Sequence, residues 1–176
     1  STALIMLSRD NVWPTNRWRE AFQAWSDEKL AKRSWRYMAI FVTSMPGDTF
    51  RELGRPIRWW LKSVVTFLDR EAVLFLALFK RVLALPYEDE IDFDDPVSRA
   101  INHPVGHITE SLIDWWYKQQ IEDNQLLSQE IKPIFSRLCV AETTKFAYGR
   151  NILATHVIPL FRVDPDWTKA NLLPLF

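Results

Sequence analysis

The chain has 176 residues, and its charges balance at 22 Lys and Arg against 22 Asp and Glu. A balanced chain has no overall field that would draw it to nucleic acid or to an anionic membrane, so we expect no membrane partner. The hydrophobic fraction is 48%, with nine Trp and eleven Phe, which excludes a disordered segment and predicts a sizeable core.

The cellular compartment is indicated by the one cysteine, Cys139, which stands in an apolar run. A single buried thiol is typical of a reducing cytoplasm and excludes an internal disulfide framework. No run of about 18 apolar residues is present, so we expect a cytoplasmic protein without a transmembrane span. The first residues carry no signal-peptide pattern and the chain ends on an apolar tail, so we expect a domain cut from a larger protein.

The first part of the chain repeats apolar residues at three- and four-residue steps, which predicts helices. We expect a short helix over residues 2–7, a helix that begins at Thr15 or Asn16, and a helix that Ser26 and Asp27 cap and that runs to about Thr43. Their inward residues are predicted to be Trp18, Phe22 and Trp25 in the second helix and Leu30, Trp35, Met38 and Val42 in the third.

The middle of the chain is predicted to hold a short helix over 48–53, a helix from Pro56 and a central helix over 71–85 that is apolar nearly all round. The stripe of the second of these is Ile57, Trp60, Leu61, Val64 and Leu68. An acidic loop over 86–95 then separates two halves of one domain spanning 1–176, and a short helix follows over 97–101.

The last part begins with a helix from Pro104 to about Gln120, in which Asn102 or His103 lies just outside the first turn. A helix over 126–142 is expected to be kinked or delayed by Pro133. Another is expected to begin at Thr143 or Thr144 and to bend or end at Pro159, and a last one over 167–173 follows a cap at 163–166. No strand is predicted.

Three stretches share a plan in which a small residue, Gly54, Gly106 or Gly149, precedes an apolar stripe. Helix-pair repeats of the HEAT and armadillo type recur roughly every 40–47 residues, and stacking lets each pair bury its apolar face. The predicted fold is therefore all-α, an irregular HEAT/armadillo-like helical-repeat (α-solenoid) array of about 8–10 helices. A compact helical bundle is the alternative.

A candidate binding surface is the basic edge, which we define as Arg51, Arg55, Arg58 and Lys62. Three of these lie at helical spacing beside Trp59, and such interleaving can contact phosphates and stack bases. The alternative is a charged outer face whose aliphatic stems cover apolar surface.

Two adjacent tryptophan pairs, Trp59-Trp60 and Trp115-Trp116, offer a second kind of contact residue. Neighbours on a helix point about 100° apart, so we predict Trp60 and Trp116 inward. Trp59 and Trp115 then contact a partner or pack against the next repeat.

A weak metal candidate is the set His103, His107 and Glu110, because residues four apart share a helical face. The alternative is a capping His103 and an exposed His107, which we favour, so we expect no metal and no cofactor. The acidic loop lacks the glycine and closing glutamate of a calcium loop. His156 lies beside apolar residues and is predicted to be structural.

Residues 102–112 and 151–168 carry a resemblance to a known family. In these two segments the chain resembles a helical domain of unknown function found in the C-terminal part of large bacterial sirtuin-like proteins of the phage-defence type. That resemblance implies a bacterial parent with an NAD-consuming catalytic domain elsewhere. No catalytic residue carries over, because this chain has no NAD-binding glycine fingerprint.

The predicted function is a non-enzymatic protein-interaction or regulatory domain, a sensor or scaffold that binds a protein partner or its own copy. The expected contact residues are Arg55, Arg58, Trp59, Lys62 and Trp115. The alternatives are a nucleic-acid-binding module that uses the basic edge from Arg51 to Lys62, and a metal-dependent hydrolase that uses the two histidines.

Overall fold

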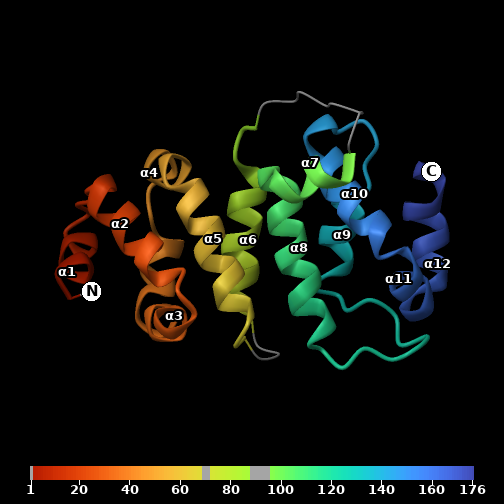
Figure 1. Cartoon of the computed structure of the whole chain (residues 1–176), viewed down its shortest axis with the longest axis horizontal. Coiled ribbons are helices and arrows are strands. Elements are labelled where there is room, and N and C mark those ends of the chain that lie inside the picture. Colours follow the sequence, from red (N-terminus) through yellow and green to blue (C-terminus); the bar gives the residue numbers. More distant parts are fainter. Residues whose placement is uncertain (1, 69–71, 88–95) are drawn as a thin grey trace. The chain divides into compact units, whose positions relative to one another are not determined.

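The computed structural model describes residues 2–68, 72–87 and 96–176, and helices are the only regular secondary structure in these ranges. Twelve α-helices, α1 to α12, lie in this described part of the chain (Figure 1). The all-α prediction is confirmed, and the number of helices exceeds the predicted one because several of the segments are short. None of the described helices is long and apolar enough to cross a membrane.

The chain divides into two compact units, Ser1–Pro86 and Tyr87–Phe176. The division falls at the start of the predicted acidic loop, of which residues 88–95 lie outside the described residues. The two units carry opposite charge. The first has fourteen Lys and Arg against eight Asp and Glu, and the second has eight against fourteen. The balance of the whole chain therefore conceals a basic unit and an acidic unit.

The first unit is built around α5, which contacts α2, α3, α4 and α6. Asp27 caps α3 as predicted, because its carboxylate accepts a hydrogen bond of 2.9 Å from the backbone N–H of Lys29. The helices of this unit are α1 (Thr2–Arg9), α2 (Thr15–Trp25), α3 (Glu28–Thr43), α4 (Gly47–Glu52), α5 (Gly54–Val65) and α6 (Val73–Ala84).

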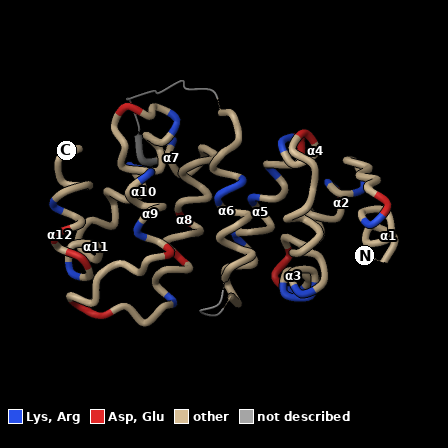
Figure 2. Tube along the Cα trace, turned by 180° about the vertical axis from the view of Figure 1, so that it is seen from behind, with Lys and Arg blue, Asp and Glu red and all other residues tan. Residues whose placement is uncertain are grey.

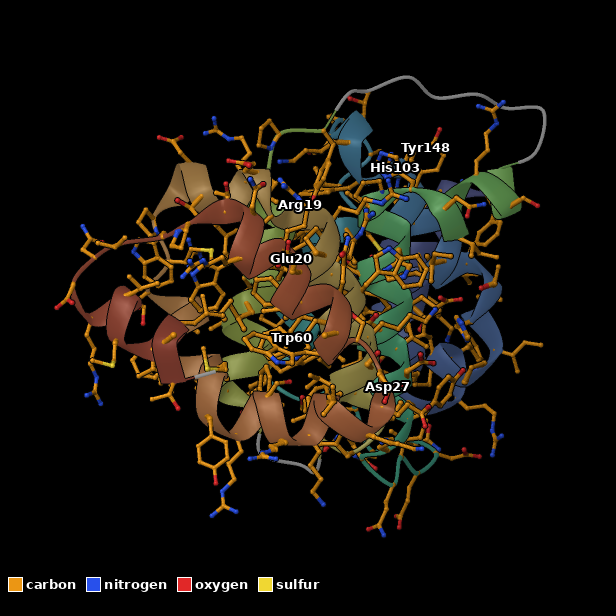
Figure 3. The ribbon with its side chains drawn as sticks, turned by 60° about the vertical axis from the view of Figure 1, so that its left-hand side comes forward. Arg19, Glu20, Asp27, Trp60, His103 and Tyr148 are labelled. Atoms are coloured by element: carbon orange, nitrogen blue, oxygen red, sulfur yellow. The ribbon has the colours of Figure 1, made fainter. Side chains whose placement is uncertain are left out.

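Trp60 is the centre of the core of the first unit, where its ring points between the helices (Figure 3). Its ring centroid lies 5.3 Å from that of Phe22, 6.1 Å from that of Trp25 and 5.4 Å from that of Trp35. Its Nε1 donates a hydrogen bond of 2.9 Å to the hydroxyl of Ser34. A buried indole needs such an acceptor, so the aromatic cluster fixes α2, α3 and α5 against one another.

The centre of the second unit is formed by α8 and α10, which contact each other and both contact α7. Its helices are α7 (Pro96–Asn102), α8 (Pro104–Tyr117), α9 (Lys132–Leu138), α10 (Ala147–Thr155), α11 (Val157–Val163) and α12 (Pro165–Trp167). A 3₁₀ turn over Thr144–Phe146 precedes α10, and a π-helical turn over Thr168–Leu172 and a 3₁₀ turn over Leu173–Leu175 follow α12.

Two glycines allow the helices of the second unit to approach closely. A Cβ on Gly106 would lie 1.8 Å from the carbonyl oxygen of Ala100. The missing side chain therefore lets α8 pack directly against the backbone of α7. A Cβ on Gly149 would lie 2.8 Å from Leu138 and 3.1 Å from the hydroxyl of Thr109. Backbone cannot move aside as a side chain can, so Gly106 is the tighter of the two contacts.

The predicted helix over 126–142 is wrong in extent, because only Lys132–Leu138 is helical. Pro133 stands in the first turn and delays the helix, as expected of a residue that lacks an N–H. The preceding segment has positive φ angles at Gln120, Asn124 and Leu126, which no helix allows.

The predicted helix from Thr143 or Thr144 is also divided, but at His156 and not at Pro159. Pro159 lies in the first turn of α11, where its missing N–H is not needed. The interruption therefore falls one turn before the proline.

Asp164 holds the C-terminal part of the second unit together. One carboxylate oxygen accepts from the backbone N–H of Trp167 at 3.0 Å, which confirms the predicted cap. The other accepts from Lys132 Nζ at 2.9 Å and from the backbone N–H of Leu127 at 3.2 Å. Burial by itself would raise the pKa of Asp164, but these three hydrogen bonds outweigh burial and lower it.

Candidate interaction surface

The predicted contact residues on α5 differ in their exposure. Arg55 is exposed and Trp59 is 48% exposed, whereas Lys62 is half-buried and Arg58 is only 7% exposed. The prediction that Arg58 belongs to an outer face is wrong, because α5 is the central helix of its unit and neighbouring helices cover most of it.

Acidic residues interrupt the basic edge along its exposed side. Asp48 lies 3.5 Å from Arg51, and Glu52 lies 2.9 Å from Arg19 of α2. Exposed pairs of this kind contribute little to stability, but they reduce the local positive potential. The edge therefore offers less to a phosphate backbone than its sequence suggests.

The tryptophan pairs are placed as predicted on their inner side, since Trp60 and Trp116 are buried. Trp115 is also buried, at 2% exposure. It therefore packs inside the protein, and it is not an exposed contact residue for a partner. Ten residues of α8 are buried, so this helix has little outward face from which an aromatic ring could project.

The three residues of the metal candidate do different things. His103 caps α8, because its Nδ1 accepts a hydrogen bond of 3.2 Å from the backbone N–H of Val105. Its ring stacks on Tyr148 with centroids 4.3 Å apart (Figure 3). His107 is buried rather than exposed, and Glu110 is half-buried. No three His, Cys, Asp or Glu side chains within the described ranges gather closely enough to hold a metal ion.

The other side chains that could take part in catalysis, His156 and Cys139, are held in structural settings. His156 Nδ1 lies 2.8 Å from the hydroxyl of Tyr117, so the histidine has a hydrogen-bond partner as predicted. Burial lowers the pKa of His156, against the opposing effect of Asp114 and Glu110. Burial raises the pKa of the Cys139 thiol to about 11, so this thiol is protonated at neutral pH and is a poor nucleophile.

A groove opens in the first unit beside α1, α3 and the end of α2, and the sequence analysis did not identify it. Its volume is about 490 Å³, which is within the range of pockets that hold ligands. We call it the α1–α3 groove; it is lined by Thr2, Ile5, Trp25, Leu30, Arg33, Ser34, Tyr37 and Met38.

The α1–α3 groove has a buried apolar floor and exposed walls. Trp25 and Met38 are almost completely buried at its base. Leu30 and Tyr37 remain 43% and 52% exposed. The prediction that Leu30 faces the core is therefore wrong: Leu30 shares the stripe of Met38, but the short α1 does not cover that end of it.

Next to the groove runs a cationic strip, which we define as Lys29, Lys32, Arg33 and Arg36. All four side chains belong to α3 and are exposed, and Figure 2 shows the basic residues gathered on this helix. Among the described residues, none of the four cations forms an ion pair. The guanidinium of Arg36 lies 5.7 Å from the centroid of the Tyr37 ring, which connects the strip to the wall of the groove.

The sequence did contain a signal for this surface. The four cations of the strip stand around the stripe of α3, and their spacing by itself indicates one side of a helix. The degree of exposure of Leu30 and Tyr37 depends on what lies across from them, which periodicity does not reveal.

Comparisons with known protein families, with curated proteins and with solved structures found no match to this chain. The candidate surface is thus defined by the geometry of the chain itself.

Proposed function

We propose that this chain is a non-enzymatic helical domain that binds a protein partner as part of a larger protein. The observation that carries the proposal is the α1–α3 groove. It combines an apolar floor, an exposed aromatic ring and unpaired cations in one place. Interfaces between proteins use this combination of aromatic and arginine side chains, with the aromatic ring desolvated on binding.

The state of the reactive groups supports a binding role over catalysis. His103 is a helix cap, His156 is held by Tyr117, and the Cys139 thiol has a raised pKa. Groups that act as bases or nucleophiles need an accessible position and a pKa near the working pH. The two histidines are engaged by neighbouring groups and the thiol is protonated at neutral pH, whereas the groove is open to solvent and offers polar and apolar side chains to a partner.

The proposal extends to how the helices are arranged and to the parent protein. Gly54, Gly106 and Gly149, which mark the three similar stretches, each occupy a site where a Cβ would meet another helix or its flank within 2.8 Å. This supports an irregular helical repeat of the HEAT/armadillo kind. In the parent, the domain would hold or release an attached effector, as the resemblance to sirtuin-like defence proteins implies.

The test is co-purification from host lysate, with and without nuclease, followed by mass spectrometry. The full chain serves as bait beside Leu30→Asp, which places a negative charge in the groove. Val12→Asp is the matched control, because Val12 is similarly exposed at 47% but lies outside the groove.

We expect a stoichiometric protein that survives nuclease, is lost with Leu30→Asp and is kept with Val12→Asp. Recovery of nucleic acid alone, or a partner that Leu30→Asp retains, would contradict the proposal.

A further inference from the structure

We infer that the α1–α3 groove binds an amphipathic helix with an acidic side, supplied by a protein partner. This inference rests on the proposed function and adds the chemistry of the partner. The occupant is an α-helical segment whose apolar side chains enter the groove while Asp or Glu residues face the cationic strip. Amphipathic helices commonly dock in this way, with anchors at i, i+3, i+4 and i+7.

The order of residues around α3 sets the shape of that occupant. At about 100° per residue, Leu30, Ser34, Tyr37 and Met38 fall on one side of the helix. The cations of the strip occupy the arc next to it, and Arg33 belongs to both the strip and the groove. The apolar and the basic surface are therefore adjacent and parallel along α3. A complementary ligand needs apolar and acidic residues in parallel rows, which an amphipathic helix provides.

The positive charge of the strip predicts that the contacting side of the partner is negatively charged. The strip carries four positive charges, and no described acidic side chain pairs with any of them. Glu28 and Asp27 stand at the start of α3, but Asp27 is engaged with the backbone N–H of Lys29. The unit as a whole has an excess of basic residues. An acidic ligand is thus attracted locally by the strip and by the basic unit that surrounds it, which raises its association rate.

The apolar part of the site favours a protein helix over nucleic acid. A nucleic-acid surface combines cations with aromatic faces that stack on bases. Here the apolar side chains that line the cavity include Ile5, Leu30 and Met38, and its one tryptophan, Trp25, is buried at the base. Tyr37 is the one exposed aromatic ring among the lining residues, so the site lacks the row of exposed rings on which successive bases stack. Covering the apolar side chains of the groove with Leu or Ile of a partner contributes favourably to the free energy of binding, because burial of apolar area is favourable and needs no particular orientation.

The experiment uses fluorescence anisotropy with the full chain and three labelled probes. The first probe is a designed peptide of about 18 residues, roughly 27 Å long as a helix, with Leu at i, i+3, i+4 and i+7 and Glu elsewhere. The second has Lys in place of every Glu, and the third is a single-stranded DNA.

Two charge-reversal variants are compared with the wild type. Arg33→Glu combined with Arg36→Glu reverses the strip. Arg17→Glu combined with Lys80→Glu makes the same change of charge at two exposed cations of the same unit that do not line the groove. All four side chains are exposed, so we expect both variants to fold, and circular dichroism of each variant tests this.

We expect the acidic probe to bind, the reversal of the strip to weaken it about tenfold or more, and the control to change it less than about twofold. We expect the basic probe not to bind. The inference is overturned if the acidic probe does not bind, if both variants weaken it equally, or if the DNA binds more tightly and is lost with the strip. Self-association of the chain that is lost with the strip would also overturn it, in favour of a second copy's acidic unit.

The two proposals fail in different ways. If the acidic probe fails while a captured partner is still lost with Leu30→Asp, the interaction function stands and only the chemistry of the ligand is wrong. If Leu30→Asp leaves the captured partner in place, the groove is not the interaction site, whatever the probes do.

Discussion

The central helices of the two units carry residues of opposite size at a key contact. In the first unit, large aromatic side chains fill the space between helices, with Trp60 at the centre of Phe22, Trp25 and Trp35. In the second, the smallest residue removes that space, because Gly106 brings α8 against α7. The comparison teaches that a helical core can reach the packing density of an organic crystal in two ways. Large side chains can fill the space between helices, or a glycine can let the helices approach until little space remains.

The first prediction concerns the bulky core. Trp60→Ala should lower the free energy of unfolding by about 3–5 kcal/mol, because it leaves a cavity and removes the donor to Ser34. The matched control is Trp59→Ala, which changes a neighbouring ring that is 48% exposed and should cost less. Urea denaturation followed by circular dichroism gives the loss, and hydrogen exchange should locate it in residues 1–86. Equal losses for the two variants would contradict the central role of Trp60.

The second prediction concerns the close approach. Gly106→Ala should destabilise the second unit by about 3 kcal/mol, since its Cβ would collide with backbone and the two helices must separate. Gly47→Ala is the control, because nothing lies within 4 Å of a Cβ there. Hydrogen exchange should increase in α7 and α8 for the first variant only. A stable Gly106→Ala variant would show that α7 is loosely held.

The third prediction concerns the carboxylate that joins α9 and α12. Asp164→Asn should cost about 2 kcal/mol at pH 7, because three donors lose a charged acceptor and the partner Lys132 is partly exposed. The lowered pKa of Asp164 means that its contribution is present above the unfolded pKa of about 3.9 and is lost as pH falls through the folded pKa. The difference between wild type and variant should therefore shrink in acid. A difference that grows in acid would contradict the direction of the shift.

The fourth and smallest effect concerns Cys139 in the second unit. Burial raises the pKa of its thiol to about 11, so alkylation by iodoacetamide should be slow at pH 8 and should increase as pH approaches that value. Free cysteine, with an ordinary pKa, serves as the reference for the rate. Alkylation at pH 8 as fast as that of free cysteine would show that the thiol is exposed and more acidic than its burial implies.

Periodicity was sufficient where one side of a helix meets the core. Trp18, Phe22 and Trp25 on α2 recur at helical steps and are buried, and the cap at Asp27 needs only its own neighbours in sequence. It was insufficient for Arg58 and Leu30. A charged residue on a central helix is buried in spite of its type, and an apolar residue at the end of a stripe is exposed when the helix across from it is too short.

The sequence by itself determined the helical class, the caps at Asp27, His103 and Asp164, and the inward position of Trp60, because each depends on residues within one or two turns. The tertiary structure decided the α1–α3 groove, the burial of Arg58 and Trp115, and the clash that excludes a side chain at Gly106. Those features depend on which distant segment lies opposite, and that choice is made by the packing of whole helices.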